Sequence, residues 1–150
     1  METDDELESN LKKTNPVLGG GGLHHAAVKT RDWNRTMRFY QEILGFTVKI
    51  AWGAAPARAI FLDAGDGSYL EVFEDLAFAP VPNGSIVHFC LRTSRIDSVC
   101  EDVRASGAKI SMEPKDATLD STNGTGLIPI RLCFFEGPSG EVIELLQGAD

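Results

Sequence analysis

Short apolar segments alternate with polar ones along the chain and predict a regular order of strands and helices. Residues 23–30 are predicted to form a strand. The helix that follows begins at Asp32, has apolar positions three or four residues apart, and ends at Gly45. Three more strands are expected, at residues 46–52, 57–62 and 68–73.

The same order begins again after a boundary at residues 80–84. A strand is predicted at residues 85–92, and a helix then starts at a capping box formed by Ser94 and Asp97 and ends at Gly107. Strands at 108–112, 128–135 and 141–146 follow, and the polar residues 113–126 predict a loop. The predicted fold is therefore α+β, with one domain at residues 23–150 built from two βαβββ modules at 23–79 and 84–148.

The two halves also match residue by residue at their first and last strands. His25 and His88 are each followed by the same order: two residues, an aliphatic residue, a basic residue and Thr. Glu71 and Glu144 each lie between two aliphatic residues, four positions after a glycine. Agreement at both ends of the two halves indicates an internal duplication. The duplication selects these two histidines and two glutamates as candidate functional residues.

Composition narrows the function classes. The chain has 150 residues, 22 acidic against 14 basic side chains and a net charge of −8, which argues against nucleic-acid binding. No apolar segment approaches the roughly 18 residues of a membrane span, and the first residues lack the basic and apolar regions of a secretory signal. Residues 1–22 are acidic at the front and end in four glycines, which predicts a disordered tail.

The cysteines and the glycine run indicate which cofactors and which cellular compartment to expect. Three isolated cysteines favour free thiols in a reducing cytoplasm and exclude a cysteine-based zinc site. The glycine run is not followed by Gly-Lys-Ser/Thr, so no nucleotide cofactor is expected. Any metal must therefore be held by histidine and carboxylate.

His25, Glu71, His88 and Glu144 form such a ligand set. Two imidazoles and two carboxylates suit Zn, Ni, Co, Mn or Fe(II). Each glutamate is flanked by apolar residues on both sides, so each is expected to be buried and to need a metal or basic partner. The alternative is that the histidines are hydrogen-bonded core residues and the glutamates face solvent. His24 is the rival of His25, but only His25 matches the repeat, and strand alternation places His24 on the opposite face.

Alternation along the same strands also predicts substrate-binding residues. Lys29 lies on the face of His25, Arg92 lies on the face of His88, and Cys90 lies between His88 and Arg92. Tyr69 and Phe73 flank Glu71. These residues predict a cavity for a small anionic or enolate-forming ligand. The alternative is that Lys29 and Arg92 reach solvent at the strand ends or pair with the glutamates.

Both ends of the chain from residue 23 onward resemble the vicinal oxygen chelate superfamily, which includes glyoxalase I, bleomycin-resistance proteins, extradiol dioxygenases and methylmalonyl-CoA epimerase. The opening resemblance comes from His24-His25-Ala26-Ala27-Val28, Asp32, Arg38-Phe39-Tyr40 and Leu44-Gly45-Phe46. The closing resemblance comes from Gly137-Pro138-Ser139-Gly140-Glu141-Val142-Ile143-Glu144-Leu145. The resemblance implies a metal-lined cup made by paired βαβββ modules, usually in a homodimer.

The four selected residues are similar to the two-His, two-Glu ligand pattern of glyoxalase I. This implies a metal-dependent lyase or isomerase in which a glutamate moves a proton through an enediolate, with Glu144 as the first candidate base and Glu71 as the second. One alternative is an Fe(II) dioxygenase, which needs two histidines and one carboxylate. Another is a non-catalytic drug-binding protein of the bleomycin-resistance type, which generally lacks the ligands. The complete set of four argues against both alternatives.

Overall fold

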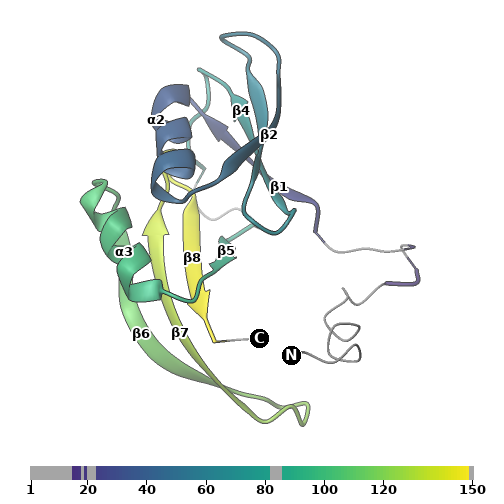
Figure 1. Ribbon diagram of the computed structural model, residues 1–150, viewed down its shortest axis with the longest axis vertical. Coiled ribbons are helices and arrows are strands. Elements are labelled where there is room, and N and C mark those ends of the chain that lie inside the picture. The colour runs from purple at the N-terminus through teal and green to yellow at the C-terminus, as the bar shows by residue number, and fades with distance from the viewer. Residues whose placement is uncertain (1–14, 18, 20–22, 82–85, 149–150) are drawn as a thin grey trace, which may run out of the picture.

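The computed structural model describes residues 15–17, 19, 23–81 and 86–148 (Figure 1). Most of the predicted N-terminal tail and residues 82–84 of the predicted boundary lie outside these residues. The described part contains two modules with the same order of elements, which confirms the predicted α+β fold of two βαβββ units. None of the helices in that part is long and apolar enough to span a membrane.

Module one begins with a strand and a helical segment. Strand β1 (His25–Thr30) is followed by helix α2 (Trp33–Arg38) and by a π-helical turn, η1 (Phe39–Ile43). Asp32 caps α2 as predicted, because its carboxylate accepts a 3.0 Å hydrogen bond from the backbone N–H of Arg35. The helical segment ends at Ile43, and Gly45 follows its C-cap with a φ of +73°, which favours glycine.

Three strands complete module one. Strands β2 (Thr47–Trp52), β3 (Ala59–Asp63) and β4 (Tyr69–Glu74) join β1 in a sheet of order β1-β4-β3-β2. Strand β1 pairs with β4 in parallel, and the other pairs are antiparallel. The first and last strands of the module therefore lie side by side, which brings the predicted histidine and glutamate strands together.

Module two repeats this arrangement. Its elements are β5 (Phe89–Arg92), α3 (Ile96–Ala105), β6 (Ile110–Asp120), β7 (Leu127–Glu136) and β8 (Val142–Gln147), with sheet order β5-β8-β7-β6. The capping box predicted at Ser94 is wrong. Helix α3 starts at Ile96, whose backbone N–H donates a 2.9 Å hydrogen bond to Oε1 of Gln147 on β8. A side chain from a distant strand thus takes the place of the local cap.

The loop predicted at residues 113–126 is wrong over residues 113–120, because β6 continues to Asp120, and only residues 121–126 connect it to β7. Pro114 lies within β6, and β6 is the outer strand of its sheet, where proline is tolerated. The pairing shifts register between Met112 and Lys115, which accommodates the proline. Figure 1 shows the resulting hairpin reaching beyond the rest of the second sheet.

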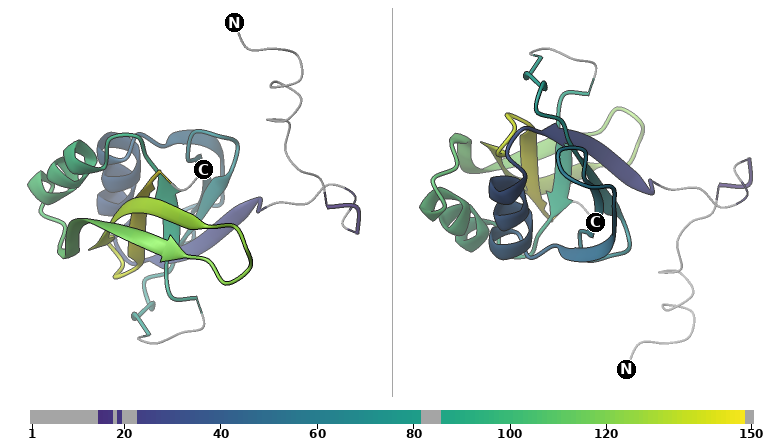
Figure 2. Two further views of the ribbon diagram at one scale, coloured as in Figure 1. Left: turned by 90° about the horizontal axis from the view of Figure 1, so that it is seen from below. Right: turned by 90° about the horizontal axis from the view of Figure 1, so that it is seen from above.

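Both modules share one hydrophobic core. Helices α2 and α3 lie side by side on one side of the molecule in both views of Figure 2. The rings of Phe39 on η1 and Phe135 on β7 meet across the modules with centroids 6.1 Å apart. Leu70 and Val72 of β4 belong to this core, so Glu71 between them points to the other face of its sheet. We call the two sheet faces turned away from the core the inner faces.

Candidate metal centre

Each module pairs its histidine with its own glutamate. His25 Nε2 lies 3.1 Å from Oε2 of Glu71, and His88 Nε2 lies 2.9 Å from Oε2 of Glu144. The strand register explains the repeated geometry. Ala27, two residues after His25, lies opposite Glu71, and Cys90, two residues after His88, lies opposite Glu144.

The glutamates are more buried than their histidine partners. The side chains of Glu71 and Glu144 are 11% and 12% exposed, against 37% and 35% for His25 and His88. A carboxylate removed from water is costly unless it is paired, and each imidazole provides one partner. The converging atoms of each pair are an imidazole nitrogen and a carboxylate oxygen. Both are ligands that a borderline divalent cation accepts, so the donor set fits such a metal.

The structure brings these residues together as two pairs. Across residues 23–81 and 86–148, no three His, Cys, Asp or Glu side chains are grouped closely enough to hold one ion. Each module of a single chain therefore presents one pair of candidate ligands on its inner face, and we call each pair a half-site.

A phenylalanine accompanies each pair, which the sequence comparison above did not single out. Phe61 lies opposite Glu71 in the sheet and its ring is 5.2 Å from that of His25. Phe134 lies opposite Glu144 and its ring is 5.2 Å from that of His88. Each phenylalanine precedes an apolar and then an acidic residue, ten positions before the glutamate of its module. This third repeat in the sequence could have identified both phenylalanines as neighbours of the histidine–glutamate pairs.

The predicted orientation of His24 is wrong. Nδ1 of His24 lies 2.9 Å from Nδ1 of His25, and the two ring centroids are 5.2 Å apart. Strand β1 starts only at His25, so strand alternation does not constrain the preceding residue. His24 consequently turns toward the inner face instead of away from it.

The predicted substrate-binding residues of module one lie around the first pair. Tyr69 contacts Phe61 with ring centroids 5.7 Å apart, and Phe73 is half-buried opposite Lys29. Lys29 Nζ lies 3.1 Å from Oδ2 of Asp75 and is half-exposed at the end of β1. The ammonium lowers the pKa of the Asp75 carboxyl through this hydrogen bond. Lys29 thus has the ion-paired position that the alternative interpretation described, although its partner is an aspartate.

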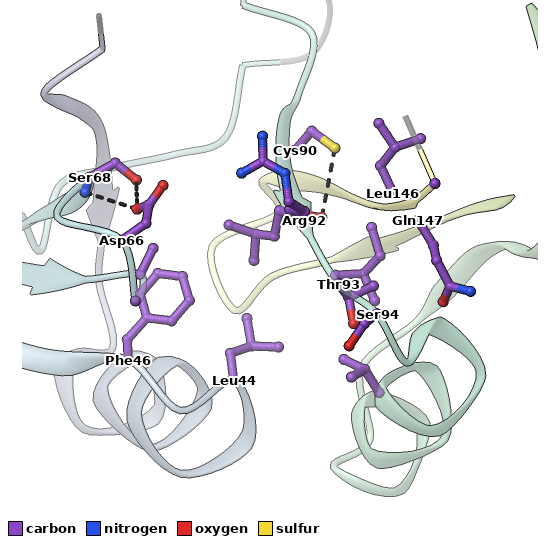
Figure 3. Close-up of a pocket in the computed structure, with 16 residues that line it drawn as sticks. Leu44, Phe46, Asp66, Ser68, Cys90, Arg92, Thr93, Ser94, Leu146 and Gln147 are labelled. Carbon is purple, nitrogen blue, oxygen red and sulfur yellow. Dashed lines mark hydrogen bonds between the residues drawn. The ribbon is translucent and has the colours of Figure 1, made fainter. Parts of the chain in front are cut away.

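A cleft of about 1010 Å³ between the modules includes the other two predicted substrate-binding residues (Figure 3). Cys90 and Arg92 line it from β5, and Leu44 and Phe46 line it from module one. Burial raises the pKa of the Cys90 thiol to about 11, and the neighbouring Glu144 carboxylate makes a smaller contribution to this rise. Cys90 is therefore a neutral thiol near pH 7, as expected for a lining residue and not for a nucleophile.

Comparison with known proteins agrees with this fold. Residues 22–145 match the family model of the Glyoxalase/Bleomycin resistance protein/Dioxygenase superfamily. An iron-dependent extradiol dioxygenase of Rhodococcus jostii is 30% identical over 138 residues, which cover 85% of this chain. The match covers 43% of the dioxygenase, so this chain spans less than half the length of that relative.

Two solved structures share the fold at low sequence identity. A trypanothione-dependent glyoxalase I from Leishmania major superimposes with a TM-score of 0.65 at 21% identity, covering 85% of this chain and 87% of that one. The fosfomycin resistance protein FosX from Mesorhizobium loti gives a TM-score of 0.60 at 18% identity, covering 83% and 89%. The chain belongs to the glyoxalase, bleomycin resistance and dioxygenase superfamily, as the sequence resemblance implied.

Proposed function

We propose that the protein is a divalent-metal-dependent lyase or isomerase of the glyoxalase type, with His25, Glu71, His88 and Glu144 as the metal ligands. The observation that carries this proposal is the repeated contact of an imidazole Nε2 with a buried carboxylate Oε2 on both inner faces. A duplicated pair of this kind is unusual for a purely structural role, because buried carboxylates are costly and rare.

The complete site is formed in a homodimer, where module one of one protomer faces module two of its partner. The shared core joins the two modules through their helical sides, which leaves both inner faces available to a second chain. A two-fold dimer then makes two equivalent sites, each with both half-sites. Exposed apolar side chains support such an interface: Ile50 and Trp52 on β2, and Leu119 and Leu127 on the β6–β7 hairpin.

A bound divalent cation would supply positive charge to two neighbouring oxygens of the substrate and so make the adjacent C–H more acidic. Glu144 takes that proton and returns it to the neighbouring carbon, and Glu71 is the second candidate for this role. Both carboxylates are largely removed from water, which limits competition from solvent for the proton that they would transfer. Arg92 lines the cleft together with Cys90, whose thiol neighbours the Glu144 carboxylate, and attracts the anionic part of a small substrate.

The test combines metal content with proton exchange. Purified protein should bind Zn²⁺, Ni²⁺, Co²⁺, Mn²⁺ or Fe²⁺, and H25A and H88A should each lose most of that binding. The loaded protein should exchange the carbon-bound proton of a hemithioacetal in D₂O without consuming oxygen. Glu101→Gln is the control, because Glu101 lies exposed on α3 and its carboxylate pairs with Arg104 on the same helix. Equal metal binding by H25A, H88A and the control would refute the proposal.

An Fe²⁺-dependent extradiol dioxygenase is the second candidate function. The 30% identity to the R. jostii dioxygenase favours it. The fourth protein ligand argues against it, since such oxygenases use two histidines and one carboxylate and leave positions open for oxygen. Oxygen consumption by the Fe²⁺-loaded protein with a catechol, and none with Zn²⁺, would select this function instead.

A further inference from the structure

The hydrogen bond between His24 and His25 connects Nδ1 of one ring to Nδ1 of the other. Nε2 of His25 faces Oε2 of Glu71, which is an acceptor. A neutral imidazole carries one N–H and one lone pair, so only one of these two His25 nitrogens can donate. Either ring of the His24–His25 pair can be the donor, and the direction of the hydrogen bond follows from the tautomer of His25.

Neighbouring rings hold His24 in the position that this hydrogen bond requires. Its centroid lies 5.0 Å from that of Tyr69 and 5.7 Å from that of Phe61, and Phe61 also contacts His25. The contact with Phe61 is edge-to-face and the contact with Tyr69 is tilted, and ring contacts of these kinds restrict the orientation of an aromatic ring. The geometry thus depends on packing from two strands, β3 and β4, as well as on the hydrogen bond.

Module two has a different residue at the same place. Val87 precedes His88, and an aliphatic side chain neither donates nor accepts a hydrogen bond. The duplication therefore kept the histidine, glutamate and phenylalanine in both halves, but the neighbour that bonds to the histidine differs. Any role of His24 is specific to the half-site of module one.

We propose that His24 is a positioning residue that sets the tautomer of His25 for metal binding. The inference rests on the proposed function, because it takes His25 as a ligand through Nε2. A ligand Nε2 must present a lone pair, so the proton of His25 has to be on Nδ1. His24 Nδ1 is placed to accept that Nδ1–H, provided that its own proton is on Nε2.

A hydrogen bond from Nδ1–H of His25 to Nδ1 of His24 leaves the lone pair of His25 on Nε2, the atom beside Glu71. The opposite direction puts the lone pair on Nδ1 of His25 and a hydrogen on the atom beside Glu71. An acceptor at position 24 therefore favours the tautomer of His25 that a metal ligand needs.

Two substitutions separate the hydrogen bond from the packing. His24→Phe keeps an aromatic ring against Tyr69 and Phe61 but removes the acceptor, and we expect Zn²⁺ affinity to fall about 10- to 100-fold. His24→Asn supplies an amide oxygen as acceptor and should lose less than His24→Phe. Val87→Ala, at the matching position of module two, is the control and should bind Zn²⁺ as the wild type does.

The decisive readout is the long-range ¹H–¹⁵N spectrum of the histidine rings with and without Zn²⁺. We expect His25 in the Nδ1–H tautomer and His24 in the Nε2–H tautomer when Zn²⁺ is bound, although His24 is not a ligand. An Nδ1–H tautomer of His24 in the Zn²⁺-loaded protein, or unchanged affinity in His24→Phe while His25→Ala loses Zn²⁺, would overturn the role of His24 alone. A metal-bound nitrogen on His24 would also overturn it, by making His24 a ligand. Wild-type affinity in His25→Ala would overturn the proposed function and this inference together.

Discussion

The phenol of Tyr40 donates a 2.6 Å hydrogen bond to Oε1 of Glu141 and so joins the two modules. Tyr40 belongs to η1 of module one, and Glu141 lies in the turn before β8 of module two. The other carboxylate oxygen of Glu141 accepts a 2.7 Å hydrogen bond from the backbone N–H of Ser139. This partly buried contact ties η1 of module one to the turn before β8 of module two, three residues before Glu144.

Removing the Tyr40 hydroxyl should destabilise the protein. Tyr40→Phe leaves one oxygen of the buried Glu141 carboxyl without its donor, and the expected cost is about 1–3 kcal/mol. Urea unfolding followed by circular dichroism measures the change. Tyr69→Phe is the matched control and should have a smaller effect, because Tyr69 is only half-buried. Equal losses of unfolding free energy in the two variants would show that the Tyr40–Glu141 hydrogen bond stabilises the protein no more than the Tyr69 hydroxyl does.

Glu141 should also make stability depend on pH. Burial raises the pKa of its carboxyl above the ordinary 4.5, and the hydrogen bonds from Tyr40 and Ser139 oppose that effect only in part. The folded state then binds the proton more tightly than the unfolded state, so the contribution is full below about pH 4.5 and is lost as pH rises through the folded pKa.

Comparison with Glu141→Gln isolates this contribution, because the amide cannot ionise and its oxygen still accepts from Tyr40. The wild type should become less stable relative to Glu141→Gln, measured as free energy of unfolding, as pH rises from 4.5 toward neutrality. Unfolding curves recorded across that range test it. A constant difference, or one that moves in favour of the wild type, would contradict the raised pKa of Glu141.

Cys90 should react slowly with alkylating reagents at neutral pH. Its thiol pKa is raised from 9.0 to about 11, which lowers the thiolate fraction about 100-fold relative to an ordinary thiol. Iodoacetamide labelling followed by mass spectrometry should show a rate that rises as pH approaches 11. Cys100 and Cys133 are buried, so labelling of the folded protein is expected at Cys90. Fast labelling of Cys90 near pH 7 would disagree with this environment.

Local patterns were sufficient to predict the duplicated fold and its paired residues. The offsets around His25 and His88 repeat, and parallel pairing of first and last strands then brings each histidine to its glutamate. The β6–β7 hairpin was missed because Pro114 and many polar residues resemble a loop, whereas the pairing depends on backbone hydrogen bonds at a sheet edge.

Contacts between distant residues could not be predicted in the same way. Tyr40 and Glu141 are separated by 101 positions, and nothing near either residue indicates the other. The cap of α3 by Gln147 and the turn of His24 toward His25 also depend on neighbours brought together only by folding. Whether the half-sites combine is a property of the assembly, which the pattern of one chain does not contain.

Mixing two complementary variants tests the proposed metal centre most directly. One chain carries His25→Ala and Glu71→Ala, and the other carries His88→Ala and Glu144→Ala, so each keeps one intact half-site. Neither should bind Zn²⁺ alone with wild-type affinity. A heterodimer formed by refolding them together joins module one of the second to module two of the first, and should regain about one Zn²⁺ site. No gain of Zn²⁺ binding in the mixture, or wild-type binding by either variant alone, would contradict a four-ligand site shared between two chains.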